Sequence, residues 1–279
     1  MSRLIIRAGA AERHYWADLW RYRELFFFLS WRDILVRYKQ TVIGVLWAVI
    51  RPILTITIFT VLFSKMAKAS SDGLPPALSV CAGNLPWQFF ATAMAEASNS
   101  LVLNSNMLSK IYFPRLIVPA SAVIVAFVDL LISLCIMAAL MVWYHITPSW
   151  RLLTLPLFVG LGLAAALAVG LWLAALNVKY RDFRYVIPFV VQFGFFVSPV
   201  GYPSDWVLQK LGEMNHGNIL QWLYLANPMV GVIDGFRWAI GGEAPLSLSL
   251  VTSLAVIAFV GVTGLRYFRR TEKTFADII

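Results

Sequence analysis

Long apolar runs separated by short polar segments dominate the pattern of the chain. The runs cover residues 42–63, 85–104, 117–143, 152–176, 186–202 and 247–267. A helix of about 20 apolar residues is long enough to cross a hydrocarbon core of about 30 Å. The pattern therefore predicts an all-α polytopic membrane protein with six transmembrane helices.

The segment before the first run has helical spacing instead of an unbroken apolar sequence. Its apolar side chains share one face: Phe27, Phe28, Trp31, Ile34, Leu35 and Tyr38. The opposite face carries Arg21, Arg23, Arg32, Asp33, Arg37 and Lys39. A cationic helix rich in aromatic residues lies in the headgroup layer of a membrane. We expect an amphipathic helix there, either as an anchor or as a lever between a soluble partner and the first span. Ser30 and Asp33 predict a capped helix start at Trp31.

Two apolar pieces between the fifth and sixth runs are too short to cross a bilayer. They extend from Ile219 to Ala226 and from Met229 to Ile240. Asn227 and Pro228 form a helix start signal, a capping residue followed by proline at the first helical position. This pattern predicts two short re-entrant helices near 203–243 that dip into the outer leaflet. A solvated aromatic loop is the alternative.

Composition and charge support a membrane location and fix an orientation. Hydrophobic residues make up 60% of the chain, charged residues 13%, and the mean hydropathy is +0.74. Of the 23 lysines and arginines, 17 fall on the side that carries both termini, five on the other side, and Arg51 lies within a run. Positive charge accumulates on the cytoplasmic side. We expect one transmembrane domain with a cytoplasmic region at 1–41, spans within 42–267 and a cytoplasmic tail at 268–279.

Three charged residues, Arg51, Glu96 and Asp129, fall near the middle of predicted spans. Such residues face protein or water because a charge in lipid is costly. They belong either to a transport pathway or moving contact, or to a static pair or a neutral acid.

A strip of small residues marks the fourth predicted span. Gly162, Ala166, Gly170 and Ala174 recur every four residues. Small residues at this spacing let helix backbones approach closely. The partner is either another helix of this chain or a second copy.

The chain lacks the sequence motifs of common active sites. It has no G-x-x-x-x-G-K-[ST] phosphate-binding loop. His14, His145 and His216 are isolated, so they predict no metal site and no Ser-His-Asp arrangement. We expect a non-enzymatic chain without a cofactor of its own.

Aromatic residues follow the first and fifth spans and the segment after them. They are Trp47, Phe59, Phe189, Phe193, Phe196 and Tyr202. Together with Arg51 they are candidates for a route along which sugars move, because aromatic faces bind sugar rings. Ordinary lipid-facing or core positions explain the same residues.

Five segments, in order, resemble one family over nearly the whole chain. They are 31–52, G-N-L-P-W-Q-F-F at 83–90, N-M-L-S-K-I-Y-F-P-R at 106–115, L-N-V-K-Y-R-D-F-R-Y at 176–185 and N-P-M-V-G-V-I-D-G-F-R-W at 227–238. They resemble the membrane (permease) subunits of type-2 ABC exporters for O-antigen, capsular polysaccharide and teichoic acid. The resemblance implies a homodimer bound to two ATPase subunits, which carry ATP and Mg. It also implies export of a polyprenyl-diphosphate-linked glycan across the bacterial inner membrane.

The resemblance assigns roles to particular residues. Contact with the ATPase falls to Trp31, Asp33, Asn106, Lys110, Tyr112, Pro114, Arg115, Arg181 and Asp182. A periplasmic gate falls to Trp206, Asn227, Pro228 and Trp238. The cations near the inner face, Arg23, Arg32, Arg37 and Lys39, are candidates for neutralising the lipid diphosphate.

Other functions remain open at this point. The same architecture serves exporters of small molecules or lipids. A membrane-embedded glycan transferase would need charged residues clustered at one depth, which Glu96, Asp129 and Asp234 do not obviously provide. A passive channel would need a polar stripe along several spans.

Overall fold

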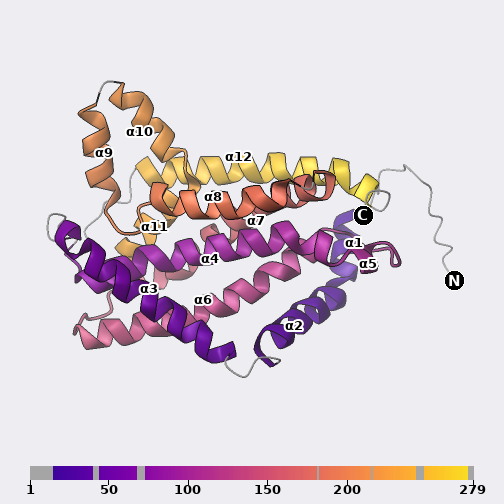
Figure 1. Ribbon diagram of the computed structural model, residues 1–279, viewed down its shortest axis with the longest axis horizontal. Coiled ribbons are helices and arrows are strands. Elements are labelled where there is room, and N and C mark those ends of the chain that lie inside the picture. Colours follow the sequence, from indigo (N-terminus) through magenta and orange to yellow (C-terminus); the bar gives the residue numbers. More distant parts are fainter. Residues whose placement is uncertain are drawn as a thin grey trace.

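The computed structural model describes residues 15–39, 44–67, 73–180, 182–214, 216–242 and 248–275, and all regular structure within these ranges is helical (Figure 1). The long helices are α2 (Arg23–Lys39), α3 (Gly44–Ala67), α4 (Pro76–Leu103), α6 (Ile117–Trp143), α7 (Leu155–Lys179), α8 (Phe183–Val197) and α12 (Leu248–Thr271). The short ones are α1 (Tyr15–Arg21), α5 (Ser105–Leu108), η1 (Trp150–Thr154), α9 (Ser204–Gly212), α10 (Gly217–Leu225), α11 (Pro228–Ala239) and η2 (Glu272–Thr274).

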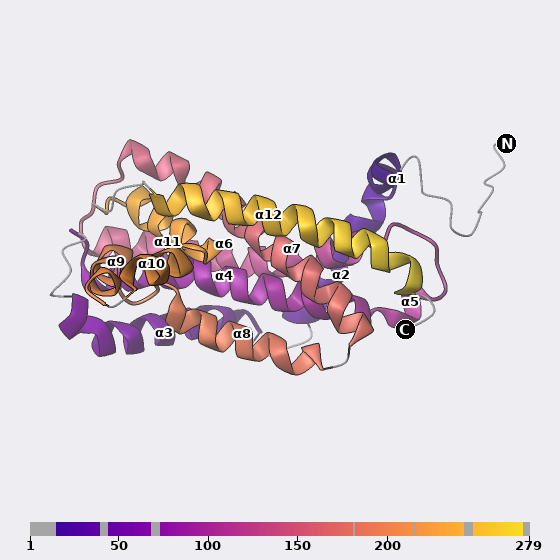
Figure 2. The ribbon, with the colours of Figure 1, turned by 90° about the horizontal axis from the view of Figure 1, so that it is seen from above.

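The long helices form an elongated bundle with two different ends. One end carries α1, α5, the turn between α7 and α8, and the last turn of α12, whereas α9, α10 and α11 lie at the other (Figures 1 and 2). The hydroxyl of Tyr15 donates to Oε2 of Glu272 at 3.1 Å, and the Arg269 guanidinium lies 4.4 Å from the Tyr15 ring centroid. The first and last described helices therefore meet at one end, in agreement with termini on one side of a membrane.

Each predicted span coincides with a helix, but the helices differ in apolar length. Within the described residues, three stretches are long and apolar enough to cross a membrane: Ile117–Trp143, Trp150–Lys179 and Leu248–Thr274. Leu46–Leu62 and Phe183–Val197 are shorter apolar helices. The chain is thus a helical, multi-pass membrane protein, and the count of six spans stays a prediction.

Helix α4 lies at the centre of the bundle. It packs against α6 and α7 most extensively and also against α3, α8 and α11, and most of its residues from Leu78 to Leu101 are buried. The amide of Asn177 on α7 donates to the Ser98 carbonyl at 3.0 Å and to Oδ1 of Asn99 at 3.1 Å. Polar residues of α4 are therefore paired with other helices.

The strip of small residues on α7 packs within the chain. A Cβ atom added to Gly170 would lie 2.9 Å from the Ala97 Cβ on α4, and one added to Gly162 would lie 3.6 Å from the Phe89 ring. Ala166 and Ala174 are fully buried. Of the two partners left open by the sequence, the structure supports the same-chain helix α4.

Helix α2 differs from the prediction in two respects. The sequence predicted a helix start at Trp31, but α2 is continuous from Arg23 to Lys39. The Ser30 hydroxyl donates to the Phe26 carbonyl at 2.8 Å, the usual bond of a serine inside a helix. The predicted helix lying flat at the surface is an oblique helix here, packed along α6 (Figure 1). Its aromatic residues Phe27, Phe28 and Trp31 remain exposed.

The segment after α8 contains the two short helices that the sequence predicted, as α10 and α11. The Asn227 side chain accepts from the Met229 amide at 3.0 Å, so the predicted cap and the start at Pro228 are confirmed. A third helix, α9, was not predicted, because Ser204–Gly212 has few apolar residues. A re-entrant path for these helices stays a prediction.

We predict that Gly170→Leu destabilises the protein by about 1–3 kcal/mol, because the new side chain overpacks the contact with α4. Gly160→Leu is the matched control on the same helix, since a Cβ there meets nothing within 4 Å. Unfolding of the purified variants in a denaturing-detergent titration measures both effects. Equal stability of the two variants would show that α7 and α4 do not approach as closely as described.

Candidate functional site

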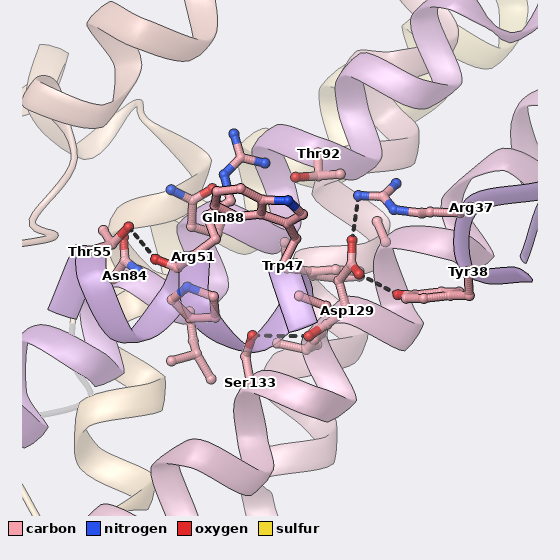
Figure 3. A pocket seen from close by; sticks show the side chains of 16 residues that line it. Arg37, Tyr38, Trp47, Arg51, Thr55, Asn84, Gln88, Thr92, Asp129 and Ser133 are labelled. Carbon is pink, nitrogen blue, oxygen red and sulfur yellow. Dashed lines mark hydrogen bonds and ion pairs between the residues drawn. The ribbon is translucent and has the colours of Figure 1, made fainter. Parts of the chain in front are cut away.

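An arginine of α2 connects two acidic residues of the bundle. The Arg37 guanidinium lies 3.2 Å from Oε1 of Glu96 on α4 and 2.6 Å from Oδ2 of Asp129 on α6. The hydroxyl of the neighbouring Tyr38 donates to Oδ1 of Asp129. Figure 3 shows Arg37 and Tyr38 both reaching Asp129. Two of the three charges predicted inside spans are therefore paired, through a cation of α2.

Polar side chains recur every four residues on each of the three helices beside this cluster. The stripes are Arg51 and Thr55 on α3; Asn84, Gln88, Thr92 and Glu96 on α4; and Asp129 and Ser133 on α6. Residues four apart share one face of a helix. The fold turns these faces toward one another. The polar stripe that the sequence analysis required of a passive channel is thus distributed over three helices.

A cavity of about 290 Å³ lies between these stripes. Its polar lining comes from Arg37 and Tyr38 of α2, Arg51 and Thr55 of α3, Asn84, Gln88 and Thr92 of α4, and Asp129 and Ser133 of α6 (Figure 3). Apolar residues, including Trp47, Leu85, Phe89 and Leu130, complete the wall. The cavity therefore combines cations, amides and hydroxyls with aromatic faces about halfway along α6.

Arg51 differs from Arg37 in its surroundings. Among the described residues, no hydrogen bond or ion pair reaches the Arg51 guanidinium. The Thr55 hydroxyl donates to the backbone carbonyl of Arg51 and not to its side chain. Both Asp129 oxygens are already engaged by Arg37 and Tyr38. The cavity thus has one cation without a counter-charge in the described part of the chain.

The residues proposed for a sugar route divide into two groups. Trp47 and Arg51 line the cavity. Phe189, Phe193 and Phe196 are exposed on α8, which lies on the same side of the bundle as α3 (Figure 2). Phe59 of α3 contacts Phe195 of α8, with ring centroids 5.0 Å apart. Tyr202 donates to the Phe196 carbonyl at 2.6 Å, at the end of the same aromatic surface.

A second buried polar cluster connects α11 to the segment between α8 and α9. Arg237, 1% exposed, donates to the carbonyls of Tyr202 at 2.9 Å and Val200 at 3.1 Å. The Ser204 hydroxyl donates to Oδ2 of Asp234 at 2.8 Å. Burial raises the pKa of Asp234 to about 6, while Arg237 and Ser204 oppose that rise. The turn between α8 and α9 is therefore tied to α11.

The four predicted gate residues lie around this cluster. Asn227 caps α11 and its amide also donates to the Ser198 hydroxyl at 2.9 Å, and Pro228 begins the helix. Trp238 contacts Trp150, with ring centroids 5.8 Å apart, and Arg151 lies 5.2 Å from its ring. Trp206 is exposed on α9. The four residues thus lie at one end of the bundle, Trp206 on α9 and the other three on α11 and its cap.

The predicted ATPase-contact residues lie in three places. Asn106, Lys110 and Tyr112 are exposed in the segment between α4 and α6, whereas Pro114 is buried and Arg115 lies 5.8 Å from the Phe275 ring. Trp31 is exposed on α2, and Asp33 pairs with Arg32 at 2.8 Å. Asp182 is exposed before α8, and Arg181 lies outside the described residues. The exposed members can meet a partner, while Pro114 and Arg115 hold the segment in place.

The four cations proposed for a lipid diphosphate fall into two groups, two in ion pairs and two exposed. Arg37 is held by Glu96 and Asp129, and Arg32 by Asp33 and by Oδ1 of Asn104 at 2.9 Å. Arg23 and Lys39 are exposed on α2. The exposed pair remains the better candidate for an external anion.

Sequence reasoning singled out Arg37, Arg51 and Asp129 but missed most of the hydroxyl and amide groups of the cavity lining. Tyr38 was assigned to an apolar face, and Asn84, Thr92 and Ser133 were given no role. A signal was present, since Asn84, Gln88, Thr92 and Glu96 are spaced by four along a predicted span. The convergence of this stripe with those of α3 and α6 required the fold.

The helical bundle with a polar cavity between its long helices is typical of membrane transport proteins. The family description "ABC-2 type transporter" matches residues 24–241, most of the chain. The chain therefore belongs to the ABC-2 type transporter family. It is 28% identical to the O-antigen export system permease protein RfbA of Myxococcus xanthus, and the similarity covers 79% of this chain and 81% of that protein. A Klebsiella pneumoniae protein of the same name is 24% identical over 89% of this chain and 92% of its own length.

We predict that Arg37→Gln lowers the free energy of unfolding by about 1–3 kcal/mol, because it leaves two carboxylates without their cation. Adding Asp129→Asn should cost less than the sum of the two single changes, since the residues interact directly. Lys210→Gln, which breaks the exposed pair with Glu213, is the control and should change stability by less than about 0.5 kcal/mol. Additive effects in the detergent titration would contradict the pairing.

Proposed function

We propose that this chain is the membrane subunit of an ATP-driven exporter that moves O-antigen or a related cell-surface glycan out of a bacterial cell. The membership in the ABC-2 type transporter family and the nearly full-length similarity to permeases named for O-antigen export carry the proposal. The aromatic surface of α3 and α8 is compatible with a glycan, because aromatic faces bind sugar rings without requiring one sequence of sugars.

The energy for export comes from separate ATPase subunits in this proposal. The sequence has no phosphate-binding loop, so ATP and Mg would bind to the partner. The partner would dock at the bundle end that carries α1 and α5, where Asn106, Lys110 and Tyr112 are exposed. By the charge asymmetry this end faces the cytoplasm of a cell whose inner membrane holds the protein.

The substrate would reach the protein as a polyprenyl-diphosphate-linked glycan. The exposed cations of α2 can attract its diphosphate, Arg23 at the start of the helix near the cytoplasmic end and Lys39 at its last turn, next to the cavity. A second copy of the chain would cover the exposed aromatic residues of α3 and α8, so that the glycan passes between the two copies. The helices α9 to α11 would close the opposite end.

Deletion of the gene in its bacterial host tests the proposed function. We expect loss of the surface glycan and accumulation of the lipid-linked glycan inside the cell, measured by surface antibody labelling and by mass spectrometry of extracted lipids. A plasmid copy should restore both. Unchanged surface glycan after deletion, with export of a drug or lipid lost instead, would favour a small-molecule exporter.

Two variants in the same strain separate the proposed contacts. Lys110→Glu with Tyr112→Ala should reduce co-purification of the ATPase and reduce export with it, because both side chains are exposed at the docking end.

Arg23→Gln with Lys39→Gln should reduce export about tenfold while the ATPase still co-purifies. Wild-type export in the second variant would remove α2 from diphosphate binding.

A further inference from the structure

The cavity between α2, α3, α4 and α6 contains polar groups that the internal contacts do not use. Arg51 projects from α3 into the cavity lining, and among the described residues its guanidinium has no counter-ion. An arginine at membrane depth is costly unless it is paired or meets water or a ligand. Arg51 is also exposed, so its guanidinium is available to water or to an anion from outside the described chain.

The other charges of the cavity do not compensate Arg51. The charged lining residues are Arg37, Arg51 and Asp129. Asp129 gives one oxygen to Arg37 and the other to Tyr38, and Glu96 is bound to Arg37. With Glu96 included, the cluster has two cations and two anions, but both carboxylates are bound to Arg37, so among the described residues neither is paired with Arg51.

Neighbouring amides add hydrogen-bonding capacity to the same space. Asn84 is 1% exposed, and its Oδ1 has no hydrogen-bond partner among the described residues. A buried polar atom without a partner is unusual in a native structure. Gln88, one turn further along α4, also lines the cavity. A ligand with both acceptor oxygens and hydroxyl or N–H groups would satisfy this lining.

We propose that the cavity binds the phosphate group of an amphiphile through Arg51, with Asn84 and Gln88 on the adjoining polar atoms. A guanidinium matches two phosphate oxygens with two N–H groups. The cavity lies about halfway along α6, so the headgroup would be held between the two ends of the bundle. This inference rests on the proposed function for one of its two possible sources, a polyprenyl-linked substrate; the other source is a bilayer phospholipid.

The cavity differs from the two exposed cations at the ends of α2. Arg23 and Lys39 are absent from its lining, whereas Arg37 belongs to it but is engaged by two carboxylates. A phosphate that leaves the exposed cations would find Arg51 as the next cation without a described partner. The two sites would therefore act in sequence along one headgroup path.

Native mass spectrometry of the full chain in a neutral detergent tests the proposal. The probes are a long-chain polyprenyl monophosphate, the polyprenol of the same length and phosphatidylglycerol. We expect wild-type protein to bind the monophosphate at least about tenfold more tightly than the polyprenol, the change that a charge-assisted hydrogen bond produces. Arg51→Gln should abolish this preference, and Arg51→Lys should keep much of it, which excludes misfolding as the cause.

The control is Arg270→Gln, which removes an exposed arginine at the end of α12 and should leave the preference unchanged. Displacement of the monophosphate by phosphatidylglycerol at the same concentration would support the phosphate site and assign it to a bilayer phospholipid. A monophosphate that is not displaced would assign the site to the polyprenyl substrate. A preference that survives in Arg51→Gln, or equal binding of the polyprenol, would overturn the proposal. Phosphate binding alongside an unaltered surface glycan in the deletion strain would instead refute the proposed function alone.

Discussion

A helix that carries polar residues at membrane depth must be surrounded by other helices, and the arrangement of the bundle follows from this requirement for α4. Its backbone groups are satisfied within the helix, but Gln88, Glu96 and Asn99 need polar neighbours. Asn177 from α7 and Arg37 from α2 supply two of these contacts. The close approach of α7 is possible because Gly170 faces Ala97. Small residues on one helix thus permit polar residues on the next.

The same requirement explains how far the sequence could predict the fold. Apolar runs mark α6, α7 and α12 clearly, because these helices carry few polar residues. Polar residues interrupt the predicted span of α4, and the same residues need the polar neighbours that surround α4 in the centre of the bundle. The cap at Asn227 could also be predicted, since capping depends on adjacent residues. Ser30 and Asp33 satisfied the same local rule, yet α2 continues through them because packing on α6 supports an unbroken helix.

The candidate site was predicted less well because its contacts connect distant parts of the chain. Arg37 and Asp129 are 92 positions apart, and nothing in either local sequence indicates the pairing. The sequence showed that charged residues fall within predicted spans, but it did not decide between a transport pathway and a static pair. The structure gives a different answer for each residue: Glu96 and Asp129 are paired, whereas Arg51 has no described partner. Charge placement indicated only that these residues face protein or water, and the fold was needed to show which of them are paired.

Helix α2 connects one end of the bundle with the cavity. It begins near α1 and α5, at the end with the exposed residues predicted to contact an ATPase, and its last turns supply Arg37 and Tyr38 to the cavity wall (Figures 1 and 3). Both side chains bind the same carboxylate on α6. Because an ion pair and a hydrogen bond depend steeply on distance, α2 cannot shift along α6 without breaking these contacts or carrying Asp129 with it. Either response changes the surroundings of Arg51, so a displacement applied to α2 reaches the cavity directly and needs no longer chain of contacts.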